Sequence, residues 1–332
     1  MEFLYREAEG QALPSAWLDF DPRFNDPFTA PRTRERLYRR HGVDIGFDPG
    51  AEGFSAMWAL ALLPPADQES HELIAILARQ VERCRRGDRY RFFPSSTAFA
   101  CDTDCTAVAA VALHRHGLLP RARLTAAARE VLHAGANGVG PHPGVVTVYW
   151  DDHAEAQALP RKRRHDAVAC ANVLHLLGLA QQDTHLEGLH AAATLRYVGD
   201  HLTSGRYLLG SRYYPAPAAF LHAASRLCTG ETAVASVLRA PLHDAVLQHL
   251  AVQPSPPTNA LDLALLILAA ENLGIAAGQR ERRTLLAGAQ RPDGSWPACP
   301  YFRMGRFTLY FGSPHLTTLF ALSALSPQRG CP

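Results

Sequence analysis

Apolar and polar positions along this chain fall into blocks of helix length, and the blocks are of two kinds. Blocks of the first kind are apolar on every face, and a helix of that composition is buried on all sides. They cover residues 54–63, 103–116, 166–177, 217–227, 259–273 and 314–325. Blocks of the second kind are amphipathic, with an apolar stripe at helical spacing and charged residues opposite. They cover residues 33–41, 70–86, 121–133, 186–202, 231–250 and 279–289.

The two kinds alternate strictly, and no segment shows strand alternation with hairpin turns. Wholly buried helices that alternate with half-buried helices fit an inner ring wrapped by an outer ring, with a two-helix repeat. We therefore predict an all-α (α/α)6 barrel, with six inner and six outer helices, over residues 32–326. Residues 1–31, with prolines between aromatics, are expected to form an irregular arm, and 327–332 a tail.

The predicted loops differ in length between the two ends of this barrel. Connections that leave an inner helix are short and carry glycine, the usual residue just past a helix end. Connections that enter an inner helix are long, namely 87–102, 134–165, 203–216 and 290–313. Long loops on a rigid scaffold commonly carry function, so we expect the site at the N-terminal ends of the inner helices.

Composition narrows the classes of function. The 332 residues include 33 basic and 31 acidic ones, a net charge of +2, which gives no electrostatic case for a nucleic-acid partner. No run reaches the roughly 18 apolar residues of a transmembrane segment. The first residues are charged and lack a signal-peptide core. Seven cysteines, an odd number without regular pairing, favour reduced thiols and a cytoplasmic location.

Candidate chemistry is concentrated where the loop 92–102 enters the buried block 103–116. Asp102 and Asp104 stand at the start of that helix, where carboxylates are costly unless they have partners. In the simplest interpretation, Asp102 is the N-cap and Asp104 interacts favourably with the helix dipole. Alternatively, burial raises the pKa of Asp104 and makes it a proton donor. Cys101, Cys105 or a loop hydroxyl could then donate hydrogen bonds to the carboxylate left behind.

The segment Asp102-Thr103-Asp104-Cys105-Thr106-Ala107 resembles the DxDD(TA) motif of class II terpene cyclases, which include the squalene-hopene cyclases. The resemblance places Asp104 on the general acid of that family and makes Asp102 and Cys105 its catalytic neighbours. Cys105 replaces the last Asp of the motif, but Asp-Cys-Thr-Ala is also found around the catalytic Asp of oxidosqualene cyclases. The resemblance implies protonation of an alkene or epoxide, ring closure through carbocations, and no redox cofactor.

A second motif, Gln290-Arg291-Pro292-Asp293-Gly294-Ser295-Trp296, resembles the QW motif of the same superfamily, whose role there is structural.

Many class II cyclases enclose their cavity between two barrels, whereas this chain has enough residues for one barrel. Either the isoprenoid substrate fits the mouth of one barrel, or the arm, the long loops or another subunit complete the wall.

The long loops also supply residues that could bind a substrate. Their aromatic side chains suit an isoprenoid, although each ring alone could simply close the core. The predicted substrate-binding residues are Phe92, Phe93, Phe99, Tyr149, Trp150, Tyr213, Tyr214, Tyr310 and Phe311. The basic run Arg161, Lys162, Arg163 and Arg164 is either a solvated loop or a diphosphate anchor before a buried helix. Mg²⁺ would assist only if the substrate is a diphosphate.

Three other functions remain open. A protein-prenyltransferase β-subunit would bind zinc through an Asp-x-Cys pair, but here Asp102 and Cys105 are three apart and Asp104 directly precedes Cys105. We therefore expect no metal ligands. A glycan-processing barrel needs two carboxylates across a cleft, which Asp104 and Asp151 or Asp152 could supply. A non-catalytic barrel that binds an isoprenoid or a protein would not need an acidic Asp104.

Overall fold

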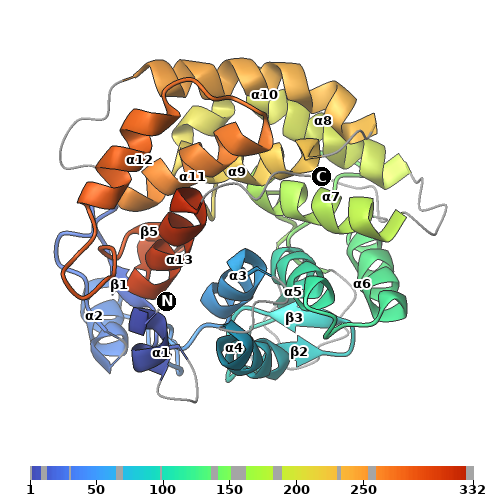
Figure 1. Cartoon of the computed structure of the whole chain (residues 1–332). Coiled ribbons are helices and arrows are strands. Elements are labelled where there is room, and N and C mark those ends of the chain that lie inside the picture. The colour runs from blue at the N-terminus through green and yellow to red at the C-terminus, as the bar shows by residue number, and fades with distance from the viewer. Residues whose placement is uncertain are drawn as a thin grey trace.

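The segments that are apolar on every face become the inner helices of a ring. They form α3 (Phe54–Leu62), α5 (Thr103–Arg115), α7 (Ala167–Gln181), α9 (Pro217–Ser225), α11 (Ala260–Asn272) and α13 (Pro314–Leu325). In the computed structural model each of these helices packs against the next, and α13 packs against α3, so the series closes (Figure 1). The structure describes residues 2–8, 13–29, 31–64, 70–97, 99–135, 141–150, 162–181, 189–229, 233–252 and 259–326.

Most of the amphipathic segments lie outside this ring. They form α4 (His71–Arg83), α6 (Arg121–His133), α8 (Leu189–Thr203), α10 (Ala233–Ala251) and α12 (Gln279–Gly288). Each packs against the inner helix that precedes it in the chain (Figure 1). Their apolar stripes, for example Leu73, Leu77 and Val81 of α4, are buried against the ring. This burial explains why the sequence shows charge on one face only.

The two helices nearest the N-terminus take different places. The segment 1–31, expected to be irregular, contains α1 (Glu2–Ala8). This helix packs against α4, and its Phe3 ring stacks 5.2 Å from the His315 ring of α13. The predicted outer helix 33–41 forms as α2 (Pro31–His41), and its His41 ring lies 5.3 Å from the Phe307 ring. The tail 327–332 lies outside the described residues, and the domain boundaries stay a prediction.

The all-α expectation is incomplete, because short strands form two small sheets at the ends of long loops. One sheet has the order β1 (Trp17–Asp19), β6 (Leu309–Gly312), β5 (Pro300–Met304), and the other β2 (Arg85–Arg86), β3 (Arg89–Arg91), β4 (Cys101–Asp102). All these pairings are antiparallel. Strands of two to five residues are too short to show a period in the sequence.

Two further findings concern the length of the helices and the state of the cysteines. None of the described helices combines the length and the apolar character that a bilayer crossing requires. The cysteines in the described ranges are free and buried, as expected for reduced thiols.

Candidate active site

The strand β4 leads directly into α5 and holds the two acids at the junction. Asp102 has extended backbone angles, and its Oδ1 accepts a hydrogen bond from the Cys105 amide at 2.7 Å. Asp102 is therefore the N-cap of α5, as its sequence position suggested. Its backbone pairs with Tyr90 of β3 and with Tyr149, so the start of the helix is held from both sides.

Asp104 lies in the first turn of α5 and is only 7% exposed. Its Oδ1 accepts a hydrogen bond from Asn172 Nδ2 at 2.8 Å, and its Oδ2 accepts one from the Tyr214 hydroxyl at 2.5 Å. Burial raises the pKa of Asp104 to about 7, the negative charge of Asp102 adds to the increase, and the two hydrogen bonds oppose it. Asp104 is thus a carboxyl group that can carry a proton near neutral pH.

Cys105 lies beside the two acids and is fully buried. Burial raises the pKa of its thiol well above the usual value, and the neighbouring carboxylates raise it further. Cys105 is therefore a neutral thiol at any ordinary pH.

A cavity of about 280 Å³ opens beside these acids, at the N-terminal ends of the inner helices. Its walls include eight phenylalanines, namely Phe47, Phe54, Phe92, Phe93, Phe99, Phe302, Phe307 and Phe311. Val43, Ile45 and Phe47 of the connection into α3, together with the β5–β6 hairpin, complete the wall. Segments of this chain itself therefore cover the mouth of the ring.

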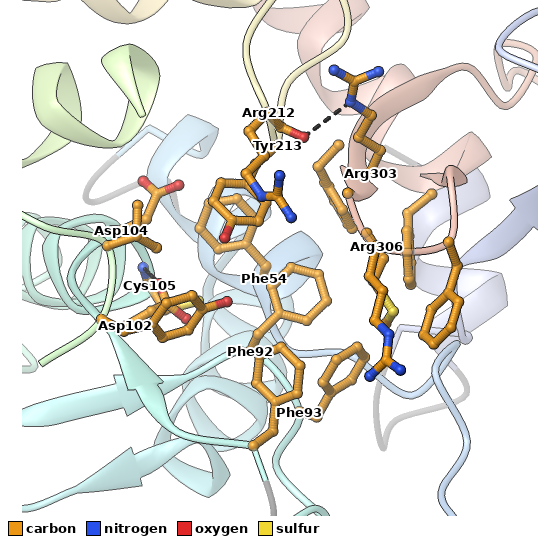
Figure 2. Close-up of a pocket in the computed structure, with 18 of the residues that line it drawn as sticks. Phe54, Phe92, Phe93, Asp102, Asp104, Cys105, Arg212, Tyr213, Arg303 and Arg306 are labelled. Carbon is orange, nitrogen blue, oxygen red and sulfur yellow. Dashed lines mark hydrogen bonds between the residues drawn. The ribbon is translucent and has the colours of Figure 1, made fainter. Parts of the chain in front are cut away.

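Three arginines line the cavity. Figure 2 shows Asp102 and Asp104 on one side, Arg303 and Arg306 on the other, and Arg212 and the labelled phenylalanines between them. Arg303 donates from Nε to the Arg212 carbonyl at 3.0 Å and from Nη2 to the Ser211 carbonyl at 2.8 Å. These acceptors are neutral, so the hydrogen bonds orient the guanidinium without cancelling its charge. The cavity is apolar in the middle, acidic at one side and basic at the other.

Comparisons with known proteins bear on the family and the fold. No protein-family model matches the chain. A curated relative, drimenol cyclase drtB of Aspergillus calidoustus, is 28% identical over 183 residues, which are 55% of this chain and 31% of the relative. The chain thus matches about a third of that protein's length.

Solved structures decide the fold. The type II terpene cyclase MstE from Scytonema superposes with a TM-score of 0.63 at 15% identity, over 98% of this chain and 93% of that chain. The ent-copalyl diphosphate synthase from Streptomyces platensis gives a TM-score of 0.59 at 14% identity, over 87% of this chain and 53% of that one. The chain has the fold of the type II terpene cyclases. Because MstE is matched over nearly its whole length, a cyclase fold of this size occurs in another protein.

Within this cyclase fold, most of the aromatic residues predicted to bind substrate line the cavity. They are Phe92, Phe93, Phe99, Tyr149, Tyr213, Tyr214 and Phe311. Two others do not belong to the described lining. The Trp150 indole donates to the Glu130 carbonyl at 2.8 Å, and its ring lies 4.4 Å beneath the Arg89 guanidinium. Tyr310 is buried in β6, next to β1.

The basic run predicted as a diphosphate anchor does not form the basic side of the cavity. Arg161 lies outside the described residues, Lys162 is exposed, and Arg163 and Arg164 are half-buried away from the lining. The acids Asp151 and Asp152, named for a glycan-processing site, also lie outside the described residues.

The arginines that line the cavity stand next to aromatic residues in the sequence, as in Phe302-Arg303 and Arg306-Phe307. This adjacency to aromatic residues was the signal that could have identified them.

Two polar residues behind Asp104 were also missed. Asn172, a buried amide of α7, is a hydrogen-bond donor to Asp104. Arg226 donates in turn to Asn172 Oδ1 at 3.1 Å. Nothing in the sequence links these residues to Asp104, since 68 residues separate Asn172 from it. Among the described residues, no group of three or more His, Cys, Asp or Glu side chains is arranged to hold a metal ion.

The QW-like segment has the structural role that its resemblance implied. Trp296 is buried, and its indole donates to the Leu286 carbonyl of α12 at 2.7 Å. Its backbone amide donates to Thr318 of α13 at 3.0 Å. The segment thereby fastens the end of an outer helix to the next inner helix.

Proposed function

We propose that this chain is a class II terpene cyclase, in which an (α/α)6 barrel holds Asp104 as the general acid for an isoprenoid substrate. The observation that carries the proposal is a buried carboxyl, with a pKa of about 7, in the wall of an aromatic cavity. A general acid with a pKa near the working pH is both protonated and able to transfer its proton. The fold shared with type II terpene cyclases and the partial match to a drimenol cyclase support the same assignment.

The proposed reaction is a cyclisation without net oxidation or reduction. The Asp104 proton adds to one carbon of a terminal alkene, whose π electrons form the new C–H bond and leave a carbocation. A neighbouring alkene attacks that cation and closes a ring. The sequence ends when the last cation loses a proton, which gives an isomer of the substrate, or when water adds to it and then loses a proton, which gives the hydrated product. In both cases the released proton replaces the one that Asp104 supplied, and Asp104 is protonated again. The phenylalanine faces around the cavity stabilise the cations and exclude water from them.

The basic side of the cavity favours a substrate with an anionic head, so we propose a polyprenyl diphosphate. Arg212, Arg303 and Arg306 can together bind phosphate oxygens, while the chain extends past the phenylalanines towards Asp104 (Figure 2). A cavity of about 280 Å³ lies at the low end of the usual range for ligand pockets, ~300–1,000 Å³. A short chain such as a farnesyl group therefore fits better than squalene.

The test is incubation of the purified protein with geranyl, farnesyl and geranylgeranyl diphosphates and with squalene, with and without Mg²⁺, followed by product analysis. We expect cyclised products that keep the diphosphate and that disappear in Asp104→Asn. Asp102→Asn is the comparison variant: Asn caps a helix about as well as Asp, and loss of the Asp102 charge should lower the pKa of Asp104, so activity should fall less than in Asp104→Asn. A folded Asp104→Asn variant that cyclises at the wild-type rate would exclude Asp104 as the acid and favour a binding role.

A second experiment addresses the head group. Arg303→Met should raise the KM for a diphosphate substrate at least tenfold and change kcat less, because Arg303 lies on the side of the cavity away from Asp104. Arg163→Met, in the basic run that does not line the cavity, is the control and should leave KM unchanged. Equal effects of the two variants would contradict the proposed binding of the diphosphate.

A further inference from the structure

Arg226 is a cation beneath the proposed acid. It follows α9 directly and begins the short helix η3 (Arg226–Cys228). Its Nη1 donates to Asn172 Oδ1 at 3.1 Å and its Nη2 contacts His175 Nδ1 at 2.8 Å. The guanidinium also lies 5.0 Å from the centre of the Trp58 ring. Arg226 does not belong to the described cavity lining, so it can act on Asp104 only through other groups.

The direct partners of this cation are neutral. Asn172 is an amide, and the pKa of His175 is lowered well below its usual value by burial and by the charge of Arg226. The neutral imidazole therefore accepts the hydrogen bond at Nδ1. Burial lowers the pKa of Arg226 to about 10, and the negative charge of Asp104 acts in the opposite direction. Arg226 thus remains protonated at neutral pH, and the Asp104 carboxylate stabilises its charge.

The hydrogen bonds fix the orientation of Asn172. A guanidinium can only donate, so Asn172 must present its oxygen to Arg226 and its NH₂ group to Asp104. An amide NH₂ cannot accept, so Asp104 Oδ1 must act as the acceptor whether or not Asp104 carries a proton. The acid proton then resides on Oδ2, whose lone pair still accepts the hydrogen bond from the Tyr214 hydroxyl, and Tyr214 lines the cavity.

We propose that Arg226 is a positioning residue that acts through Asn172 to place the acid proton of Asp104 on Oδ2 and to stabilise the carboxylate formed when that proton leaves. The proposal rests on the proposed function. Before proton transfer, Arg226 is a half-buried cation, and none of the described residues places a counter-ion in contact with it. After transfer, the new carboxylate compensates its charge through the polarised amide. The fold therefore favours release of the proton, as alkene protonation requires.

Other charged or titratable groups surround the two ends of this chain of hydrogen bonds. Asp104 is faced by Asp102, Asp166, Cys170, Tyr214 and Tyr301, and Arg226 by Arg115, His175, His222 and Tyr301. Arg115 provides a control, because it is another arginine at the end of an inner helix, although it is exposed. It donates to the Ala61 carbonyl at 2.8 Å.

The experiment titrates Asp104 directly and needs no turnover. The C=O stretch of the protonated carboxyl is followed with pH by infrared difference spectroscopy, in which the same protein with Asp104→Asn supplies the baseline. We expect Arg226→Met to raise the titration midpoint by about one pH unit or more, as removal of a nearby opposite charge does. Asn172→Leu should raise it as well, Arg226→Lys should raise it less, and Arg115→Met should leave it in place.

The pH–rate profile then tests the catalytic consequence. For Arg226→Met we expect the alkaline limb of kcat to move up with the midpoint, and the low-pH plateau of kcat to fall about tenfold, because a weaker acid transfers its proton more slowly. KM should not change. An unmoved midpoint in Arg226→Met, or an equal shift in Arg115→Met, would overturn the inference.

These measurements separate the two proposals. If no substrate is cyclised by the wild-type protein or by any variant, the proposed function fails, while the titration still decides whether Arg226 acts on Asp104. If the wild-type protein cyclises and Asp104→Asn does not, but Arg226→Met keeps the wild-type midpoint and plateau, only the inference about Arg226 fails.

Discussion

Replacing Asp104 by Asn should make the protein more stable at alkaline pH while it removes the proposed acid. The new amide has nearly the same size as the carboxyl. Its oxygen can accept from Asn172, and its NH₂ group can donate to the Tyr214 oxygen, so both hydrogen bonds at 2.8 Å and 2.5 Å have counterparts. The difference between the two proteins is then the cost of ionising a buried carboxyl, which the amide does not incur.

The magnitude follows from the pKa of Asp104 in the two states. In the folded protein it is about 7, and in the unfolded chain it takes the ordinary value of 3.8. Between these values the folded state keeps the proton and the unfolded state loses it, so the stability of the wild-type protein falls as pH rises from about 4 to about 7. A difference of about three pKa units corresponds to a loss of at most ~4 kcal/mol, which is complete above pH 7.

Urea unfolding of both proteins, at about pH 4 and about pH 8, measures this difference. We expect nearly equal stabilities at the lower pH and a more stable Asp104→Asn variant at the higher pH. Asp44→Asn is the control of opposite sign, because hydrogen bonding to Arg34 lowers the pKa of Asp44. A stability difference between Asp104→Asn and wild type that is the same at both pH values would refute the reasoning about burial.

Three further substitutions test other parts of the structure. Gly210→Ala should lower both the stability of the protein and kcat. Gly210 has φ +67°, and a Cβ there would lie 2.2 Å from the Pro215 carbonyl oxygen, beside the tyrosines at the cavity. Thermal unfolding and turnover measure the two effects. Trp296→Phe should destabilise the protein by ~1–3 kcal/mol, because the Leu286 carbonyl loses its donor, but kcat of the remaining folded enzyme should not change. Cys105→Ser should stay within about tenfold of wild-type kcat, because a hydroxyl can still donate where the neutral thiol does; a complete loss in a folded variant would give Cys105 a larger role.

The sequence by itself determined the helices and the end of the ring that carries the site. A helix that is buried on all sides is apolar on every face, and a helix that is half-buried is apolar on one face. The spacing of apolar residues in the sequence therefore indicates how each helix is buried. The position of Asp104 at the start of a buried helix followed from the same pattern, and the motif resemblance gave it a role. The long loops before the inner helices indicated the functional end because chain direction alone places them there.

Only the tertiary structure decided which side chains meet in the cavity. Arg212 and Arg303 lie 91 residues apart and come together because two loops cross at the mouth of the ring. Asn172 of α7 contacts Asp104, and Arg226, which follows α9, contacts Asn172; no local sequence pattern records such contacts between helices. Trp150 is aromatic like the lining residues, but its indole NH donates to the Glu130 carbonyl on an outer helix, and the side chain does not belong to the cavity lining. Side-chain direction depends on the partners that the closed ring offers, and those partners exist only once distant segments have packed.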